Sequence, residues 1–106
     1  MPDKKGFTFE IQYTKAADKF FRTHEDVRTA YEDSISELLF GSHPERVDVK
    51  SIKGKRNTYY RIRLGEYRVV YAIINGEIVV ISTLIAGTRG DIYKKMGGLN
   101  NSHSFL

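Results

Sequence analysis

Cysteine is absent from this chain of 106 residues, and only two prolines are present. Without cysteine there is no disulfide framework, no thiolate metal site and no cysteine nucleophile, which fits a reducing compartment. The first residues are polar, and no apolar stretch resembles a signal peptide or a membrane span. We therefore expect a cytoplasmic protein with no membrane partner.

The composition is that of one folded domain. Hydrophobic residues make up 41% of the chain and charged residues 28%. This hydrophobic fraction is too high for a disordered chain. Neither an internal repeat nor a low-complexity tract appears in the sequence. A chain of this length can bury one compact core.

The net charge of +4 is unevenly distributed. Residues 1–48 contain seven Lys and Arg against ten Asp and Glu, whereas residues 49–106 contain ten against three. A basic C-terminal half suggests a polyanionic partner, although many soluble proteins have a basic surface that binds nothing in particular.

The first half of the chain predicts one strand and two helices. Phe7, Phe9, Ile11 and Tyr13 alternate with polar residues, which indicates a half-buried strand. Thr14 is the expected N-cap of a short helix and Thr23 that of a second, which ends near Gly41. The apolar stripe of the second helix comprises Val27, Ala30, Tyr31, Ser34, Ile35, Leu38 and Leu39.

The second half predicts a loop and a three-stranded antiparallel meander. Residues 47–57 are basic and turn-rich, and we expect them to form the loop. The strands are expected at residues 58–64, 67–74 and 77–85, joined by tight turns at Gly65-Glu66 and Asn75-Gly76. The first strand should join this meander and the helices should pack on one face of the sheet, which gives an α+β fold. Residues 96–106 are expected to form a flexible C-terminal tail after a domain at residues 1–95.

A turn at Gly65-Glu66 fixes which side chains share a face of the sheet. It places Arg63 opposite Arg68, with Arg61 on the same face. Like charges opposite one another are destabilising, so an anion is expected there. The alternative is a solvated face with the arginines paired to carboxylates, for which this half offers only Glu66, Glu77 and Asp91.

The third strand should leave the sheet near this arginine face. Extending the register through Asn75-Gly76 places Thr83 opposite Arg68. Arg89 and Tyr93 can then reach the arginines from one edge. Taken singly, Arg89 is a surface turn residue and Tyr93 a packing aromatic.

Several motifs in this order resemble the RelE/ParE toxin superfamily, in particular its RelE-type mRNA interferases. They are Ser51-Ile52-Lys53-Gly54, Tyr60-Arg61-Ile62-Arg63-Leu64, Tyr67-Arg68-Val69-Val70-Tyr71, Gly87-Thr88-Arg89 and Tyr93. The resemblance covers residues 7–95 and includes the order of the elements.

The resemblance implies the toxin of a type II toxin–antitoxin system, which inhibits translation and is silenced by an antitoxin protein. Such a toxin is a ribosome-dependent endoribonuclease that needs no metal or other cofactor. It cleaves mRNA in the A site through attack by the ribose 2′-OH. The implied catalytic residues are Arg61, Arg63, Arg68, Arg89 and Tyr93, and the expected RNA-binding residues are Lys50, Lys53, Lys55, Arg56, Lys94 and Lys95.

The general base is left open by the sequence. Members of the family can have lysine where this chain has Arg61 and Arg63, and arginine keeps its proton. Lys53, Lys55 and Tyr93 are the candidates, with Tyr93 preferred. His24, His43 and His103 show no metal-ligand spacing and are expected at the surface.

Two other functions remain open at this point. A ParE-like protein would inhibit DNA gyrase by protein contact and would need no catalytic cluster. A catalytically weak RNA-binding relic would keep the basic face without the reaction. The combination of Arg68, Arg89 and Tyr93 favours the ribonuclease.

Overall fold

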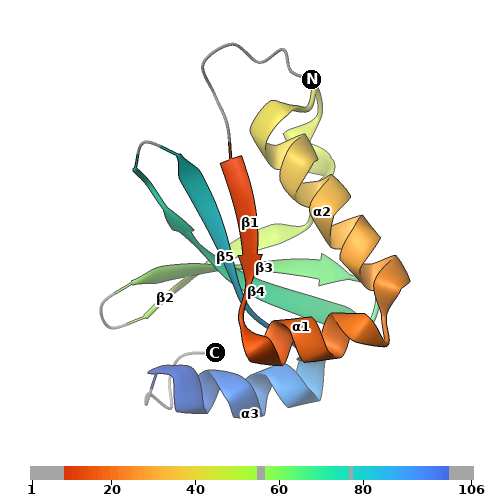
Figure 1. The fold of residues 1–106 in the computed structure, drawn as a ribbon, viewed down its shortest axis with the longest axis vertical. Coiled ribbons are helices and arrows are strands. Elements are labelled where there is room, and N and C mark those ends of the chain that lie inside the picture. Colours follow the sequence, from red (N-terminus) through yellow and green to blue (C-terminus); the bar gives the residue numbers. More distant parts are fainter. Residues whose placement is uncertain (1–8, 55–56, 77, 101–106) are drawn as a thin grey trace.

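A five-stranded mixed sheet organises the molecule (Figure 1). The computed structural model describes residues 9–54, 57–76 and 78–100, with side chains as far as Lys94. The strand order is β1-β5-β4-β3-β2, in which β1 and β5 are parallel and all other pairs are antiparallel. The strands are β1 Phe9–Tyr13, β2 Val49–Lys53, β3 Thr58–Leu64, β4 Tyr67–Ile74 and β5 Val79–Thr88.

Two helices connect β1 to the rest of the sheet. Helix α1 spans Lys15–Arg22 and α2 spans Glu25–Phe40. The Thr14 hydroxyl caps α1 by accepting from the Ala17 N–H at 3.2 Å, and it donates to the Leu84 carbonyl of β5 at 2.6 Å. This cap confirms the expected start of α1 and ties the corner between strand and helix to the sheet.

The predicted cap of the second helix is wrong by one residue. His24 is the N-cap of α2 and makes no side-chain cap hydrogen bond. Thr23 instead ends α1, and its backbone N–H donates to the Phe20 carbonyl at 3.2 Å. Since only two residues separate the helices, Thr23 is used by the end of the first helix and is not available to the second.

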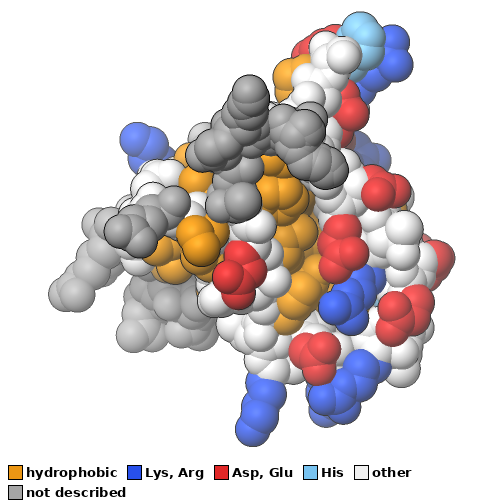
Figure 2. All heavy atoms as spheres, turned by 45° about the horizontal axis from the view of Figure 1, so that its top comes forward, with side chains coloured by type: hydrophobic (Ala, Val, Ile, Leu, Met, Phe, Trp, Pro, Cys, Tyr) orange, Lys and Arg blue, Asp and Glu red, His pale blue; other side chains and the backbone are white. Residues whose placement is uncertain are grey.

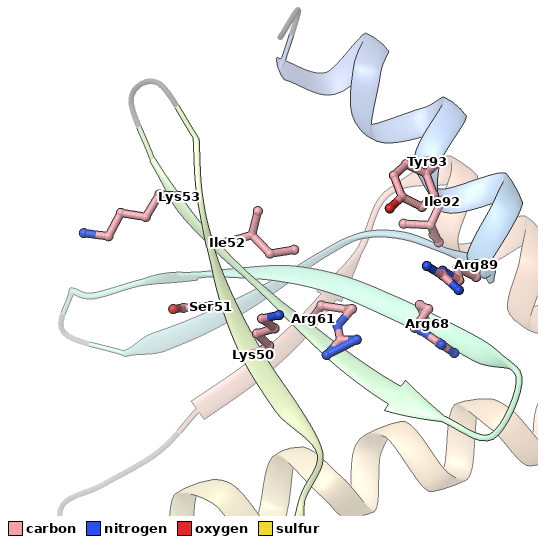
Figure 3. A pocket seen from close by; sticks show the side chains of 9 residues that line it. All are labelled: Lys50, Ser51, Ile52, Lys53, Arg61, Arg68, Arg89, Ile92 and Tyr93. Atoms are coloured by element: carbon pink, nitrogen blue, oxygen red, sulfur yellow. The ribbon is translucent and has the colours of Figure 1, made fainter. Parts of the chain in front are cut away.

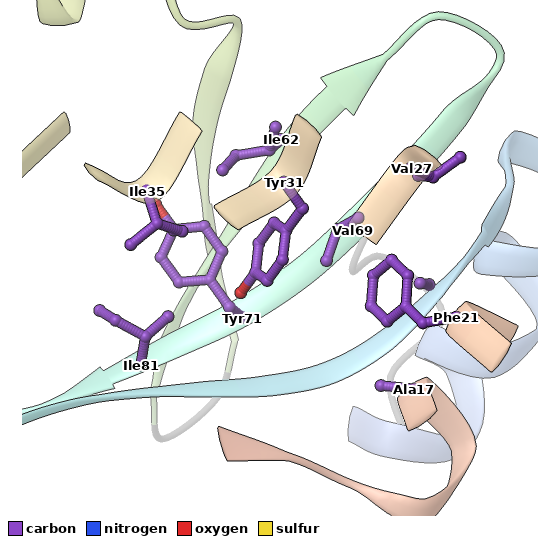
Figure 4. Packing of buried hydrophobic residues seen from close by; sticks show 10 residues of the cluster. Ala17, Phe21, Val27, Tyr31, Ile35, Ile62, Val69, Tyr71 and Ile81 are labelled. Atoms are coloured by element: carbon purple, nitrogen blue, oxygen red, sulfur yellow. The ribbon is translucent and has the colours of Figure 1, made fainter. Parts of the chain in front are cut away.

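The main core lies between α1, α2 and one face of the sheet (Figure 4). Phe21, Tyr31 and Ile35 of the helices pack there with sheet residues that include Ile62, Val69, Tyr71 and Ile81. The Tyr31 hydroxyl and Thr83 Oγ1 form a 2.7 Å hydrogen bond at the centre, where both residues are fully buried. The expected packing of these two helices on one face is confirmed.

The prediction of a loop over residues 47–57 is wrong for part of that segment. A 3-10 turn at Pro44–Arg46 leads into β2, which pairs with β3 from Val49↔Ile62 to Lys53↔Thr58. Val49 and Ile52 are partly buried, whereas Lys50 and Lys53 are exposed. Lysines are common on edge strands because they discourage pairing with other chains, so the basic composition concealed a strand.

The register between β3 and β4 is confirmed, but that between β4 and β5 is not. Arg63 pairs with Arg68 as expected, and Gly65 has a φ of 65° in the turn. Arg68, however, pairs with Gly87 and not with Thr83, because Ile74 already pairs with Val80 and a bulge follows at Val70/Tyr71. β5 also pairs with β1 and must bury Thr83 towards the helices, and these requirements override the local Asn75-Gly76 signal.

Helix α3, Arg89–Asn100, follows β5 directly. Its Ile92 is buried against Tyr59, Val70 and Ile85, a second cluster on the face of the sheet opposite to α1 and α2. The expected boundary between domain and tail, at residue 95, falls inside this helix, and residues 101–106 lie outside the described part.

Charge is mixed over part of the surface. Figure 2 shows a strip of hydrophobic side chains with acidic and basic groups interspersed beside it. Within the described residues, no helix is long and apolar enough to cross a membrane. Positive charge is instead concentrated in a pocket on the α3 side of the sheet, described next.

Candidate active site

A pocket of about 420 Å³ opens between β2, β3, β4 and the start of α3 (Figure 3). Five cationic side chains line it, together with an aromatic ring, two isoleucines and a serine. The lining consists of Lys50, Ser51, Ile52, Lys53, Arg61, Arg68, Arg89, Ile92 and Tyr93. The structure therefore brings together residues that are separated by up to 43 positions in the chain.

Sheet register places the central cations side by side. Lys50 of β2 is the partner of Arg61 on β3, and Arg61 lies opposite Val70, two residues from Arg68 on β4. The Arg61 side chain is 21% exposed, and its Nε is buried without a hydrogen-bond partner in the part of the chain that the structure describes. A buried donor without a partner carries a desolvation cost.

The β3–β4 turn holds the Arg68 side chain in place. Its Nη1 donates to the Gly65 carbonyl at 3.2 Å and to the Tyr67 carbonyl at 3.3 Å. Burial lowers the pKa of Arg68, and the positive charges of Arg63, Arg61 and Arg89 lower it further. Each of these causes disfavours the charged form, so an anion that entered the pocket would relieve the repulsion.

Arg63 lies opposite Arg68 on the expected face of the sheet, but its side chain does not line the pocket. Its side chain is 55% exposed, and its Nη1 lies 3.8 Å from Oδ2 of Asp48. The other carboxylate oxygen of Asp48 lies 3.9 Å from Nη2 of Arg61. Asp48 thus bridges two arginines at the rim.

Sequence reasoning missed Asp48 because it was assigned to the acidic half of the chain. The signal that reveals it is alternation: Asp48 and Lys50 are two residues apart, so they share a face once β2 is recognised as a strand. The alternative of arginines paired with carboxylates therefore applies to Arg61 and Arg63 at the rim, but the carboxylate is that of Asp48 and not one of the three expected.

Arg89 and Tyr93 project from the first turns of α3. The Arg89 guanidinium carbon lies 6.0 Å from the centre of the Tyr93 ring, as expected for residues four apart on a helix. Tyr93 is 50% exposed. Ile92 between them is buried in the second cluster, so it anchors both side chains at the pocket.

The expected RNA-binding lysines are placed unequally. Lys50 lines the pocket, whereas the Lys53 ammonium points away from the arginines although its side chain lines one edge (Figure 3). Lys94 is exposed and does not line the pocket. Lys55, Arg56 and the Lys95 side chain lie outside the described residues.

The described histidines lie away from the pocket lining. His24 stacks on Phe20 with ring centroids 4.0 Å apart, and His43 Nδ1 lies 3.1 Å from Glu45. His103 is outside the described residues. Among the residues that the structure describes, no group of three or more His, Cys, Asp or Glu could hold a metal ion.

The fold and the pocket define an α+β protein with a cationic site on one face of a mixed sheet. No protein-family model matches the chain, and no curated protein sequence matches it. Among solved structures, a chain of the RelB–RelE antitoxin–toxin complex from Methanococcus jannaschii is similar, with a TM-score of 0.53 and 28% sequence identity. The similarity covers 79% of this chain and 96% of that chain. The expected RelE-like α+β fold is therefore confirmed.

Proposed function

We propose that this chain is the toxin of a type II toxin–antitoxin system and cleaves mRNA on the ribosome. The observation that carries the proposal is the pocket, where Arg61, Arg68 and Arg89 converge beside the exposed Tyr93. Similarity to a chain of an antitoxin–toxin complex supports the assignment to such a system, and it supports a cognate antitoxin as protein partner.

The chemistry we propose is transesterification. The 2′-oxygen of a ribose bonds to the adjacent phosphorus, the bond to the 5′-oxygen of the next nucleotide breaks, and a 2′,3′-cyclic phosphate forms. A base takes the 2′-OH proton and an acid supplies one to the leaving oxygen. Negative charge grows on the phosphoryl oxygens meanwhile, and guanidinium groups aimed at them stabilise the transition state.

Tyr93 is the preferred group for proton transfer. Guanidinium groups keep their protons, so the arginines serve as charge stabilisers and not as bases. The Lys53 ammonium points away from the arginines, and Lys55 is not among the described residues. Tyr93 lies at the pocket with half of its surface open, where its hydroxyl can meet a substrate.

The test is to map RNA ends after adding the protein to a purified translation system, with and without ribosomes. We expect cuts within translated codons in the presence of ribosomes. Arg89→Ala should reduce the cleavage rate by about 10²-fold or more, since one donor to the transition-state charge is lost. Arg22→Ala is the matched control, because Arg22 is an exposed arginine of α1 paired with Asp18.

Intact transcripts would contradict the proposal. Intact transcripts together with inhibition of DNA supercoiling by gyrase would favour the ParE-like alternative instead. Equal loss of cleavage in Arg89→Ala and Arg22→Ala would show that the pocket is not the site.

A further inference from the structure

Asp48 places a negative charge at the rim of a pocket whose other charged groups are positive. Its carboxylate lies 3.9 Å from Arg61 and 3.8 Å from Arg63. It also counteracts the lowering of the Arg68 pKa by the neighbouring arginines. Among the described residues, no other carboxylate lies within 4.0 Å of a cation at this site.

The backbone fixes the position of Asp48. Its carbonyl accepts from the Arg63 N–H at 3.0 Å, immediately before β2 begins. The carboxylate is therefore presented to Arg61 and Arg63 by the sheet itself. A substrate phosphate that binds Arg61 has to share that guanidinium group with it or displace it.

We propose that Asp48 is an internal competitor for the phosphate of the RNA substrate, and that it weakens ground-state binding at the arginine pocket. This inference rests on the proposed function for the identity of the ligand. The competition itself applies to any anion that binds Arg61.

Competition outweighs any role of Asp48 in holding the arginines in place. Arg61 is 21% exposed, so packing on the sheet holds it without the carboxylate. Arg68 is held by two backbone carbonyls of the β3–β4 turn. Removing the carboxylate takes an ion-pair partner from both Arg61 and Arg63, but of these two only Arg63 is more than half exposed, and it lies outside the pocket lining. Removing the charge should therefore free Arg61 without disordering the site.

The size of the effect follows from exposure. Asp48 is 54% exposed, and partly solvated ion pairs are individually weak. Asp48→Asn should tighten anion binding by about two- to fivefold. The gain should shrink as salt is raised, because the Debye length falls from about 10 Å at 0.1 M to about 3 Å at 1 M.

The experiment measures binding of two probes to the full chain. A single-stranded 2′-O-methyl RNA, which lacks the attacking hydroxyl, is followed by fluorescence anisotropy, and inorganic phosphate by the NMR signal of the Arg61 Nε–H. We expect Asp48→Asn and Asp48→Ala to bind both probes more tightly and Asp48→Glu to behave like the parent chain. Asp33→Asn, which removes an exposed charge from α2, is the matched control for net charge.

Unchanged or weaker phosphate binding by a folded Asp48→Asn and Asp48→Ala would overturn the inference, and so would an equal gain in Asp33→Asn. The two proposals fail separately. If the parent chain does not bind the RNA while phosphate binding still tightens in the variants, the proposed function is contradicted and the competition by Asp48 stands.

Discussion

The cationic pocket predicts how strongly RNA binding depends on salt. Five cations line it, and four of them lie together, Lys50, Arg61, Arg68 and Arg89, whereas the Lys53 ammonium points away from the arginines. For single strands, the logarithm of the binding constant falls with the logarithm of salt concentration with a slope of about −0.7 per neutralised phosphate. If each of these four cations neutralises one phosphate charge, the slope is about −2.8, and affinity falls by about 50-fold between 50 and 200 mM salt.

Arg89→Ala isolates the contribution of one cation. Removing it should change the slope to about −2.1, so affinity falls by about 20-fold over the same range of salt. Arg89 projects from α3 and forms no ion pair with another residue that the structure describes, so its loss should leave the sheet in place. Arg22→Ala, which changes the net charge equally but lies on α1, should keep the parent slope.

Fluorescence anisotropy with a 2′-O-methyl RNA provides the measurement, at five or more salt concentrations and with no cleavage to complicate it. A parent slope near zero would refute the idea that the pocket binds phosphates. A slope that changes as much in Arg22→Ala as in Arg89→Ala would refute the assignment of those contacts to the pocket and point to diffuse charge.

Two further predictions concern the core and its tyrosines. Tyr31→Phe and Thr83→Val should each lower the free energy of unfolding by about 1–3 kcal/mol in urea denaturation, because each leaves the partner hydroxyl buried without a hydrogen bond. The double variant should lose less than the sum of the two single losses, and strict additivity would show that the two hydroxyls do not interact. Burial raises the pKa of Tyr71 to about 12, and burial also raises the pKa values of Tyr13 and Tyr31. The unfolded chain therefore loses these protons first, near pH 10, so this part of the stability is fully present below pH 10. It should fall by up to about 1.4 kcal/mol per pH unit for each of the two more buried tyrosines, Tyr31 and Tyr71, up to about pH 12, and by less for the more exposed Tyr13. Tyr71→Phe should reduce that slope, and an unchanged slope would contradict the assignment.

The β3–β4 hairpin shows what local sequence can determine. A two-residue turn with glycine in its first position leaves one register available, and Gly65 has the positive φ that such a turn requires. The pairing of Arg63 with Arg68 followed directly from this turn. At Asn75-Gly76 an equally strong local signal was misleading, because the register of β5 also depends on its pairing with β1, whose residues lie 70 positions before their partners in the sequence.

The two elements that were missed form the walls of the site. β2 has a composition typical of a loop but is held by pairing with β3, and α3 contains Gly97-Gly98, which disfavours a helix by about 1 kcal/mol per glycine. Burial of Ile92 against the sheet is a tertiary contact that no propensity reveals. Both elements exist because of partners distant in sequence.

The origin of these elements explains why the pocket was predicted only in part. Arg61 and Arg68 come from one hairpin, so the local turn was enough to place them on one face. Arg89 and Tyr93 depend on α3, and α3 depends on Ile92, which is 3% exposed. Docking of the helix and completion of the cation cluster are therefore the same structural event. The repulsion among the arginines opposes that event, burial of Ile92 favours it, and an anion in the pocket would favour it further.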